Sequence, residues 1–426
     1  MKVVIIGAGI AGLGAAHYFL KKGHEVQVLE SSERVGGRAM TYQRPGTQDI
    51  VDVGTQYYHS SYRRALAFIY ESGMQSNLRK IRGYTRIYDD NLKKGSFLFN
   101  RYLPWYQSYG VAGNLQLGLY LAKTFIKYEM DPYALNYYAK ADDINAVIDN
   151  SNSAIYKSII QPLTQVGALS EPEDMAVSLH HMHRLIHIIL FTEYLSLTGG
   201  VSSLHKAMSK QIPVALESPV LGLVEENGKP IGVQLENDVI KADHIVVATT
   251  PHVASKMVPD SWGEAHKFLD EINIPQFSLP TFFLDRPIEK GVWSFLLHQR
   301  EGMISYLTDA SQKNREMVPS GQSIIQPWVC YPQSATLAAM SDDDITSCCI
   351  NEIETIFPGF SSWIEHVYIT RHPYGVPFHS TGHVKRACDF MHAMDKRKIS
   401  FCGDYISGGY MESALWSAER AAKVFG

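Results

Sequence analysis

The chain has 426 residues, of which 45% are hydrophobic and 19% are charged, and its formal net charge is −4. This length exceeds what one compact core supports, so we expect two domains, or one domain with a large insertion. The weak negative charge and the lack of a basic arm or lysine-rich run argue against a general affinity for nucleic acid or anionic membranes. No stretch reaches the roughly 18 uninterrupted apolar residues of a transmembrane helix.

The five cysteines are scattered, odd in number and without the spacing of a metal site. We therefore expect free thiols in a reducing cytosol, and hence a cytoplasmic protein. Two of them are adjacent and could form a redox-active pair, although the interior of a helix is the favoured setting. The five are Cys330, Cys348, Cys349, Cys388 and Cys402.

The first thirty residues predict a dinucleotide-binding unit. A short apolar run, Val3 to Ile6, predicts a buried parallel strand and leads directly into a G-x-G-x-x-G sequence. In such a loop one glycine permits the tight turn, the second lets a pyrophosphate approach the backbone, and the third allows the next helix to pack closely. That helix, at about 10–22, directs its N-terminal amides at the phosphates, and an acid that follows a second strand at 25–29 binds the ribose. The predicted contacts are Gly7, Gly9, Ile10, Ala11, Gly12, Glu30 and Ser31.

The acid Glu30 does not distinguish NAD from FAD, because both carry that ribose, but the residues after it do. The sequence VGGR at 35–38, with Thr41, closely resembles the corresponding segment of flavin-containing amine oxidases, protoporphyrinogen oxidases and carotenoid-type desaturases. The resemblance implies FAD as the cofactor, with Gly36 and Gly37 beside its pyrophosphate and Arg38 near the phosphates and the flavin. The chemistry agrees, since paired glycines permit close approach and a guanidinium complements a diphosphate.

Residues 50–54 predict a strand that ends in a tight turn, and a helix is expected at about 62–72. The segment 52–58 resembles the D-x-G segment of the same superfamily, whose turn runs along the flavin ring. The resemblance implies cofactor contacts at Gly54, Thr55 and Gln56. In that superfamily the residues that follow face the substrate cavity, and the alternative for such an aromatic cluster is plain packing. The cavity candidates here are Tyr57, Tyr58 and His59.

Between residues 75 and 198 the alternation of strands and helices disappears. Short alternating pieces at 84–88 and 96–99 predict a hairpin, and the remainder predicts a largely helical layer that roofs a cavity. The expected helices cover about 112–129, 132–140, 144–149, 154–160 and 174–196. The last one carries His180, His181, His183 and His187. A zinc site needs three or four ligands with supporting carboxylates, so a packed face is favoured and we predict no metal.

The sequence GGVSSL at 199–204 predicts the return to the nucleotide-binding domain, because the superfamily has a G-G-x-x-x-L turn there that starts a helix. The helix is expected at about 203–211 and is followed by a strand that contains Val220, which the resemblance places against the adenine. A meander of short strands is expected at 223–225, 232–235 and 239–240. Residues 242–251 predict a buried parallel strand that ends at a proline turn and carries Thr249, another predicted cofactor contact.

Residues 279–394 look like a second passage through the substrate domain. Strands are expected at 280–284, 293–297, 323–330 and 366–370, and Ser341 should cap a helix at about 342–356. Typical amine oxidases carry a lysine just before the first of these strands, near the flavin, where this chain has the sequence SLP at 278–280. The sequence RHPYGVP at 371–377 is more similar to protoporphyrinogen-oxidase-type or desaturase-type relatives. Tyr374 and His379 are cavity candidates, and the alternative is a structured loop pinned by prolines.

The C-terminal segment strongly resembles the superfamily's C-terminal FAD signature, with a strand at 399–401, a Gly-Asp pair and a helix at 412–425. In that signature the Gly-Asp binds the ribityl chain and phosphate, and the helix N-terminus steadies negative charge on the reduced flavin. The predicted cofactor contacts here are Gly403, Asp404, Met411, Glu412 and Ala414, and Tyr410 is a further cavity candidate.

Three separated stretches thus match one superfamily in the same order. We predict an α/β fold in which a Rossmann-type FAD-binding domain is interleaved with an α+β substrate domain made of a mixed sheet and a helical insertion. The FAD-binding domain is expected to comprise residues 1–74, 199–279 and 395–426. The substrate-binding domain is expected to comprise residues 75–198 and 280–394.

The predicted function is that of an FAD-dependent oxidoreductase, either an oxidase or dehydrogenase or a desaturase. It takes a hydride from a C–N or C–C bond of a small to medium, largely apolar substrate, and dioxygen or another electron acceptor reoxidises the flavin. Two alternatives remain open: a redox-neutral flavin-dependent mutase or isomerase, and a non-catalytic flavoprotein. The sequence does not specify the oligomeric state.

Overall fold

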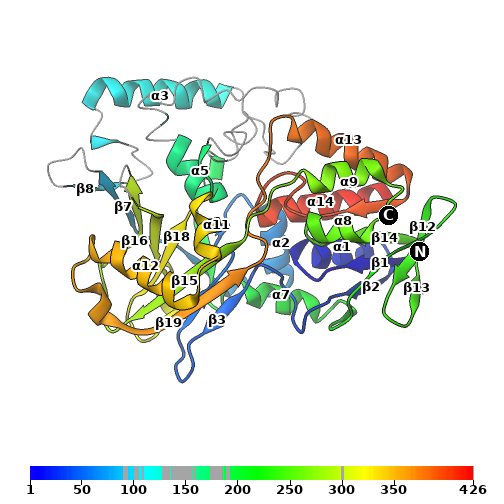
Figure 1. Ribbon diagram of the computed structural model, residues 1–426, viewed down its shortest axis with the longest axis horizontal. Coiled ribbons are helices and arrows are strands. Elements are labelled where there is room, and N and C mark those ends of the chain that lie inside the picture. Colours follow the sequence, from blue (N-terminus) through cyan, green and yellow to red (C-terminus); the bar gives the residue numbers. More distant parts are fainter. Residues whose placement is uncertain are drawn as a thin grey trace.

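The computed structural model describes residues 1–425 except 90–94, 100–104, 108–109, 127–134, 136–155, 157–159, 173–184, 186, 189–191 and 299–301. Two bodies, each built around its own large sheet, lie side by side (Figure 1). The α/β class with a parallel and a mixed sheet is the one that the sequence predicts. No helix in the described residues is long and apolar enough to cross a membrane.

A five-stranded parallel sheet forms the first body, with the strand order β10-β2-β1-β14-β20. Its strands are β1 (Lys2–Ile6), β2 (Glu25–Leu29), β10 (Val214–Ala215), β14 (His244–Val247) and β20 (Ile399–Phe401). They come from three distant stretches of the chain, and Ile245 of β14 pairs with both Val4 and Ile399. The predicted strands at 3–6, 25–29 and 399–401 are confirmed.

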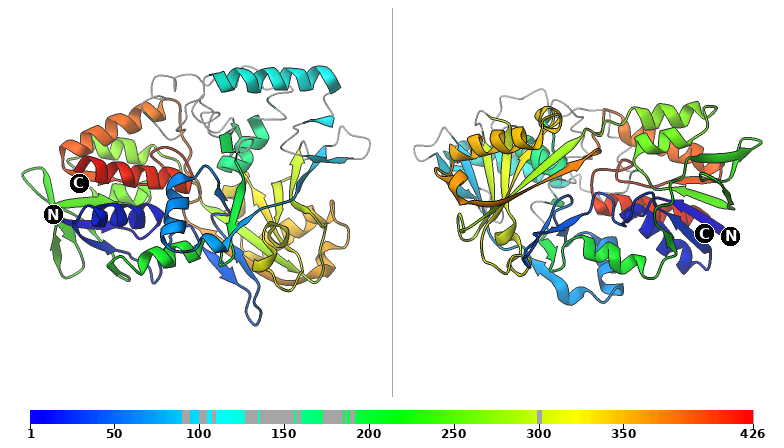
Figure 2. Two further views of the ribbon diagram at one scale, coloured as in Figure 1. Left: turned by 180° about the vertical axis from the view of Figure 1, so that it is seen from behind. Right: turned by 60° about the horizontal axis from the view of Figure 1, so that its bottom comes forward.

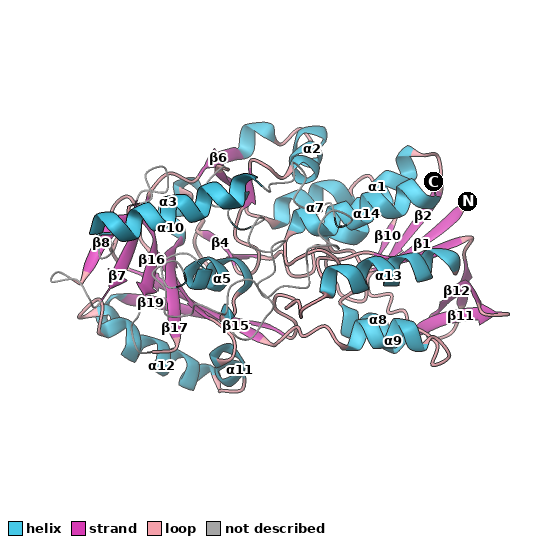
Figure 3. Ribbon diagram, turned by 90° about the horizontal axis from the view of Figure 1, so that it is seen from above, coloured by secondary structure: helices cyan, strands magenta, loops and turns pink. Residues whose placement is uncertain are grey.

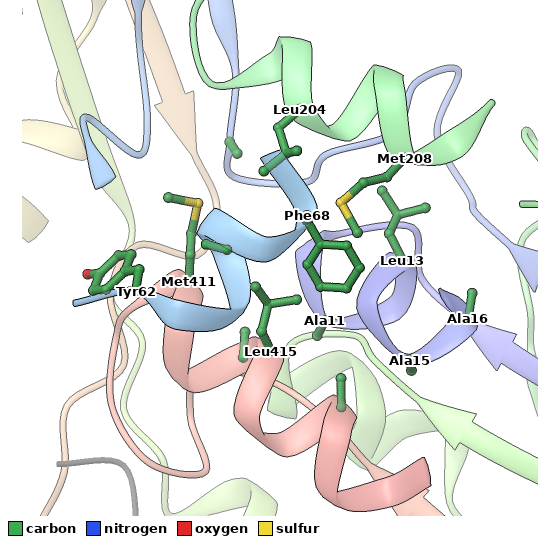
Figure 4. Close-up of a cluster of buried hydrophobic side chains, with 14 of the residues drawn as sticks. Ala11, Leu13, Ala15, Ala16, Tyr62, Phe68, Leu204, Met208, Met411 and Leu415 are labelled. Carbon is green, nitrogen blue, oxygen red and sulfur yellow. The ribbon is translucent and has the colours of Figure 1, made fainter. Parts of the chain in front are cut away.

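Helices cover both faces of this sheet, because alternate residues of a buried strand point to opposite sides. Val3 and Ile5 of β1 pack with one layer of helices, and Val4 and Ile6 pack with the other. The first layer is α1 (Ile10–Lys21), α2 (Arg63–Glu71), α7 (Ser202–Ser209) and α14 (Met411–Phe425), and the second is α8 (Pro251–Met257), α9 (Gly263–Asp270) and α13 (His383–Lys396). Figure 4 shows side chains of the four helices of the first layer meeting in one cluster, and Figure 2 shows both termini at this body.

The prediction of a strand around Val220 is wrong. The outer edge of the parallel sheet is already paired by the preceding residues, since the carbonyl oxygens of Pro213 and Ala215 accept the amides of Val28 and Glu30. Val220 is buried in the connection that follows. The predicted meander is confirmed as β11 (Gly222–Glu226), β12 (Lys229–Gln234) and β13 (Val239–Lys241).

A seven-stranded mixed sheet forms the second body, with the order β19-β15-β18-β17-β16-β7-β8. Its strands are β7 (Tyr84–Asp89), β8 (Ser96–Phe99), β15 (Phe277–Leu284), β16 (Val292–His298), β17 (Ile304–Asp309), β18 (Ile324–Val329) and β19 (Ile364–His372). One face is covered by α12 (Asp342–Glu354) (Figure 3). Its Ile345 and Ile353 join a cluster with Phe282 and Phe295. The other face carries aromatic side chains and α5 (Gln161–Ala168). The predicted hairpin and the helix capped by Ser341 are confirmed.

The prediction that the helix at 174–196 reaches residue 196 is also wrong. Its last residues form β9 (Tyr194–Leu197), which pairs with β5 (Tyr58–His59) and β6 (Leu78–Lys80). All four residues of β9 are buried, so the strand pairing and burial override the local helical pattern. The predicted helix near 112 is confirmed as α3 (Gly110–Ile126). The helix predicted at 144–149 and most of those predicted at 132–140, 154–160 and 174–196 lie outside the described residues.

Candidate functional site

The glycine-rich loop between β1 and α1 combines two tightly packed glycines with one that faces open space. A Cβ added at Gly12 would lie 1.9 Å from the carbonyl oxygen of Gly7, and one at Gly7 would lie 2.9 Å from the carbonyl oxygen of Ala248. A Cβ at Gly9, in contrast, would meet no heavy atom within 4 Å. The loop is therefore closed on the protein side and open at Gly9, as a site for a pyrophosphate requires.

The predicted acid and the glycine pair both lie against this loop. Glu30 accepts the amide of Ala8 through Oε2 at 2.7 Å. The amide of Gly36 donates to the carbonyl oxygen of Ala8 at 2.9 Å, and Gly37 has a φ of 55°, which favours glycine. A Cβ added at Gly37 would approach the Cα of Gly9 to 3.7 Å. The residues expected to contact ribose and pyrophosphate are thus grouped around one loop.

Arg38 joins the N-terminal and C-terminal segments. Its Nη1 and Nη2 atoms donate to the carboxylate of Asp404 at 2.8 and 2.7 Å, and Nη1 also donates to the carbonyl oxygen of Gly375 at 2.8 Å. Planar bidentate pairing of this kind fixes both side chains. Two residues that the resemblance assigns to the same cofactor, 366 positions apart in the sequence, are therefore in direct contact.

The side chain of Glu412 caps a neighbouring helix. Its carboxylate accepts the backbone amides of Arg64 and Ala65, in the first turn of α2, at 3.0 and 3.1 Å, and it pairs with the Arg64 guanidinium at 3.1 Å. Burial raises the pKa of this carboxyl, while these hydrogen bonds oppose the shift. Any contact of Glu412 with a cofactor would therefore come from its backbone at the N-terminus of α14, next to the amide of Met411. The amide of Ala414 already donates to the carbonyl oxygen of Tyr410 at 3.2 Å.

The turn at 52–56 lies where the two bodies meet. A Cβ added at Gly54 would lie 2.0 Å from the carbonyl oxygen of Arg38 and 3.4 Å from Cε1 of His372. His372 is held by a contact of 2.7 Å between Nε2 and the carbonyl oxygen of Val53. Gln56 folds back over the turn, and its Nε2 donates to the carbonyl oxygens of Asp52 and Gly54. The turn therefore connects Arg38 with the strands of the mixed sheet.

An aromatic cluster continues from this turn. The ring of Tyr57 lies 5.1 Å from that of Tyr194, 6.1 Å from that of Trp293 and 5.2 Å from that of His59. Burial raises the pKa of Tyr57, and the hydroxyls of Tyr194 and Tyr410 add to the shift. Tyr57 and Tyr410 therefore lie close enough for their hydroxyls to interact.

The remaining cavity candidates lie in packed surroundings. Tyr58 is fully buried in the core of the parallel sheet, and His59 contacts Thr192 at 3.0 Å. His379 stacks on His383 at the start of α13, with ring centroids 3.7 Å apart. Tyr374 stacks on His252 of α8 at 5.6 Å. These four side chains therefore have packing contacts, as Tyr57 does. Tyr57 also contacts Trp293 of the mixed sheet, and the hydroxyl of Tyr410 would lie 3.2 Å from a Cβ added at Gly167 of α5, so these two lie where the bodies meet.

Four further cofactor contacts are predicted at Thr249, Val220, Thr55 and Ser31. Thr249, just after β14, lies beside the first glycine, since its Cγ2 would be 3.5 Å from a Cβ at Gly7. Val220 packs in the cluster of the second helix layer. Thr55 donates its amide to the carbonyl oxygen of Arg38 at 3.4 Å, and Ser31 lies next to Glu30.

Metal ligands do not gather in the described part of the chain, where no three His, Cys, Asp or Glu side chains are placed to hold an ion. His180, His181 and His183 lie outside the described residues. Burial lowers the pKa of His187, the fourth member of that sequence cluster.

Sequence reasoning missed three residues around the turn at 52–56: His372, Lys313 and Gln326. Lys313, at the end of α10 (Ala310–Lys313), donates to the turn, and Nε2 of Gln326 donates to the carbonyl oxygen of Asp52 at 2.9 Å. Strand periodicity signals that Gln326 lies in a buried strand, but no local pattern distinguishes Lys313 from a surface lysine. Its position results from contacts that span 261 residues.

Comparison with known proteins agrees with this geometry. The profile of the flavin containing amine oxidoreductases matches residues 10–424. The flavin-dependent L-tryptophan oxidase RebO of Lentzea aerocolonigenes is 36% identical over 83 residues, which is 19% of this chain and 18% of RebO, so this match spans less than a fifth of either protein.

Solved structures match over nearly the whole length. Cyclohexylamine oxidase from Brevibacterium oxydans superposes with a TM-score of 0.77 at 15% identity, covering 99% of this chain and 98% of that one. The fatty acid isomerase from P. acnes gives a TM-score of 0.75 at 16% identity with the same coverage. At such identities these two show the common fold, whereas the profile shows the family. The chain belongs to the flavin-containing amine oxidoreductases, a family of FAD-dependent enzymes.

Proposed function

We propose that the protein uses FAD to take a hydride from a C–N or C–C bond of a small to medium, largely apolar substrate. The observation that carries the proposal is the turn at 52–56, which contacts Arg38 on one side and leads into the aromatic cluster of Tyr57 on the other. A flavin bound along this turn would have its phosphates at the glycine loop and its ring at the aromatic cluster. When bound, FAD supplies a two-electron acceptor.

The residues of the chain then have separate roles. Glu30 would bind the ribose, the open face at Gly9 and the pair Gly36–Gly37 would admit the pyrophosphate, and Arg38 with Asp404 would hold the phosphate and ribityl region. We assign residues 1–74, 199–279 and 395–426 to the FAD-binding domain, and 75–198 with 280–382 to the substrate-binding domain. Residues 383–394, expected in the substrate-binding domain, form most of α13, which packs on the parallel sheet, and we assign them to the FAD-binding domain. The parallel sheet drawn from all three FAD-binding stretches supports this division.

The aromatic cluster favours a substrate without charge. A tyrosine hydroxyl is already protonated near neutral pH, and burial raises the pKa of Tyr57 further, so this hydroxyl can donate a hydrogen bond but carries no charge. Aromatic walls also exclude water and orient an apolar molecule by contact area. Hydride transfer from an apolar carbon is compatible with this environment, since the reaction needs orientation more than a strong base.

The test is anaerobic reduction of the purified holoprotein. Amines, amino acids, polycyclic compounds and prenyl-like compounds are added without oxygen, and loss of the oxidised flavin absorbance is followed. Bleaching by apolar compounds, followed by recovery on admission of dioxygen or a dye, supports the proposal. Bleaching by charged amino acids alone would overturn the substrate class, and a folded protein that takes up no FAD would overturn the function.

A redox-neutral isomerase is the second candidate, because the fold is shared with the fatty acid isomerase named above. Such an enzyme converts its substrate without net reduction of an acceptor. Product formation in the absence of oxygen or dye consumption would favour it over the oxidoreductase. We also propose a cytoplasmic location, which is supported by the finding that all five cysteines are free thiols.

A further inference from the structure

Lys313 has an ammonium group buried at the junction of the two bodies. The side chain is 2% exposed and ends beside the turn at 52–56. Its Nζ atom donates to the carbonyl oxygen of Gln56 at 2.8 Å, to Oε1 of the same residue at 3.2 Å and to Oδ2 of Asp52 at 3.3 Å. An ammonium has three N–H donors, so these three acceptors satisfy it.

Its ion-pair partner, Asp52, is itself fixed by the nucleotide-binding segments. Oδ1 of Asp52 accepts the hydroxyl of Thr41 at 2.8 Å and the amide of Val201 at 2.9 Å. The carboxylate is 1% exposed. One buried carboxylate therefore joins the segment after the glycine pair, the return segment that opens α7, and Lys313 from the mixed sheet.

Burying a charged ammonium group costs free energy, which other interactions must offset. Burial lowers the pKa of Lys313, whereas the Asp52 carboxylate raises it. A pair that served stability alone would be replaceable by apolar side chains at little cost. The shortest contact of the ammonium is with the backbone of the turn and not with the carboxylate, so the side chain is directed at the position of the turn.

We propose that Lys313 is a positioning residue that holds the Gly54–Tyr57 turn in place and supplies the cation that neutralises Asp52 beside it. This rests on the proposed function, in which the turn runs along the flavin. Without that cation the Asp52 carboxylate would be uncompensated near the flavin, and a negative charge there disfavours the reduced, anionic flavin and lowers its midpoint potential. Lys313 reaches the turn from α10. Typical amine oxidases carry their lysine at a different place, which corresponds to residues 278–280 of β15 in this chain.

The test compares Lys313→Met with the double variant Lys313→Met/Asp52→Asn and with Lys313→Arg. The single variant leaves Asp52 buried without a cation, so we expect a lower unfolding temperature. The double variant removes both charges with side chains of similar size, and we expect it to regain most of that temperature. Lys385→Met, at an exposed Lys–Asp pair, is the matched control for loss of a lysine and is expected to leave the unfolding temperature unchanged.

The deciding measurement is the midpoint potential of the bound flavin, read from absorbance against a redox dye. At the potential where the wild-type flavin is half reduced, we expect Lys313→Met, which leaves the Asp52 carboxylate without its cation, to be mostly oxidised. The double variant, which has the same net charge as the wild type, and Lys313→Arg are expected to stay near half reduced. A Lys313→Met variant that binds FAD and keeps the wild-type potential would overturn the proposal. If Lys313→Met does not fold, the double variant decides: FAD binding weaker than that of Lys313→Arg supports the positioning role, and equal binding overturns it. Wild-type protein that takes up no FAD would instead overturn the proposed function itself.

Discussion

Replacing Gly9 by valine separates the fold of the nucleotide loop from its capacity to bind FAD. Gly9 has a φ of −71° and a ψ of −179°, an extended conformation that valine adopts readily, and a Cβ there meets no heavy atom within 4 Å. At this helix N-cap, valine is less favourable than glycine by about 1 kcal/mol. Loss of a glycine also lowers the entropy of the unfolded chain, which stabilises the protein by about 0.4–1 kcal/mol. The free energy of unfolding of the FAD-free protein should therefore change by less than about 1 kcal/mol.

The effect on FAD binding should be much larger. The valine side chain would occupy the open face where the pyrophosphate is proposed to lie, and overlap of this kind costs about 1–3 kcal/mol. Each displaced hydrogen bond from a backbone amide to a charged phosphate adds about 1.5–3 kcal/mol. A total above about 3 kcal/mol corresponds to FAD binding that is more than about 100-fold weaker.

The assay combines thermal unfolding of FAD-free protein with a fluorescence titration of FAD. Gly12→Ala is the matched comparison, because its Cβ would lie 1.9 Å from a backbone oxygen and should destabilise the fold itself. We expect Gly9→Val to unfold near the wild-type temperature and to bind little FAD. Wild-type FAD content in that variant would refute the placement of the pyrophosphate.

Three further variants probe the surroundings of the site. Gly54→Ala should destabilise the protein by about 3 kcal/mol or more, measured by urea unfolding, because its Cβ would lie 2.0 Å from the carbonyl oxygen of Arg38; an unchanged midpoint would contradict this packing. Glu412→Ala should lower the free energy of unfolding by about 3 kcal/mol, because it removes the buried cap of α2. The control Glu419→Ala, which removes a more exposed partner of the same arginine, should lower it by less than about 1 kcal/mol. Equal losses in the two variants would contradict the role assigned to Glu412. Burial lowers the pKa of His205 from 6.5 to about 4, so the unfolded state binds the proton first, and this histidine's contribution to stability is lost as the pH falls from 6.5 towards 4. His205→Asn should therefore lose less stability than the wild type between pH 7 and pH 5, and parallel curves for the two proteins would argue against it.

The nucleotide loop could be predicted because its chemistry is local. The glycines, the strand before them and the acid after them lie within thirty residues, and each has a steric or hydrogen-bonding reason for its position. The pairing of Arg38 with Asp404 depends on residues 366 positions apart, and only the resemblance assigned both to one ligand.

What could not be predicted depends on long-range burial. Lys313 follows a sequence typical of an exposed helix end, and only the packing of α10 against the turn at 52–56 buries its ammonium group. β9 was expected to be helical because its apolar spacing fits a helix, but pairing with β5 and β6 determines its conformation. Glu412 matched a cofactor signature, yet its side chain caps α2, a contact that depends on the docking of two helices. The sequence therefore predicts which backbone segments a ligand would approach more reliably than it predicts which side chains hold those segments in place.

The order of strands in the parallel sheet has a consequence for biosynthesis. β14 lies between β1 and β20, and the strands β15 to β19 come between β14 and β20 in the sequence. A nascent chain can pair β1 with β14 but presents an open apolar strand edge until residues 399–401 leave the ribosome. During that interval the intervening mixed sheet can already form, whereas the C-terminal helix has not yet docked on α1. The growing polypeptide is therefore expected to be vulnerable to edge-to-edge association until β20 has paired with β14.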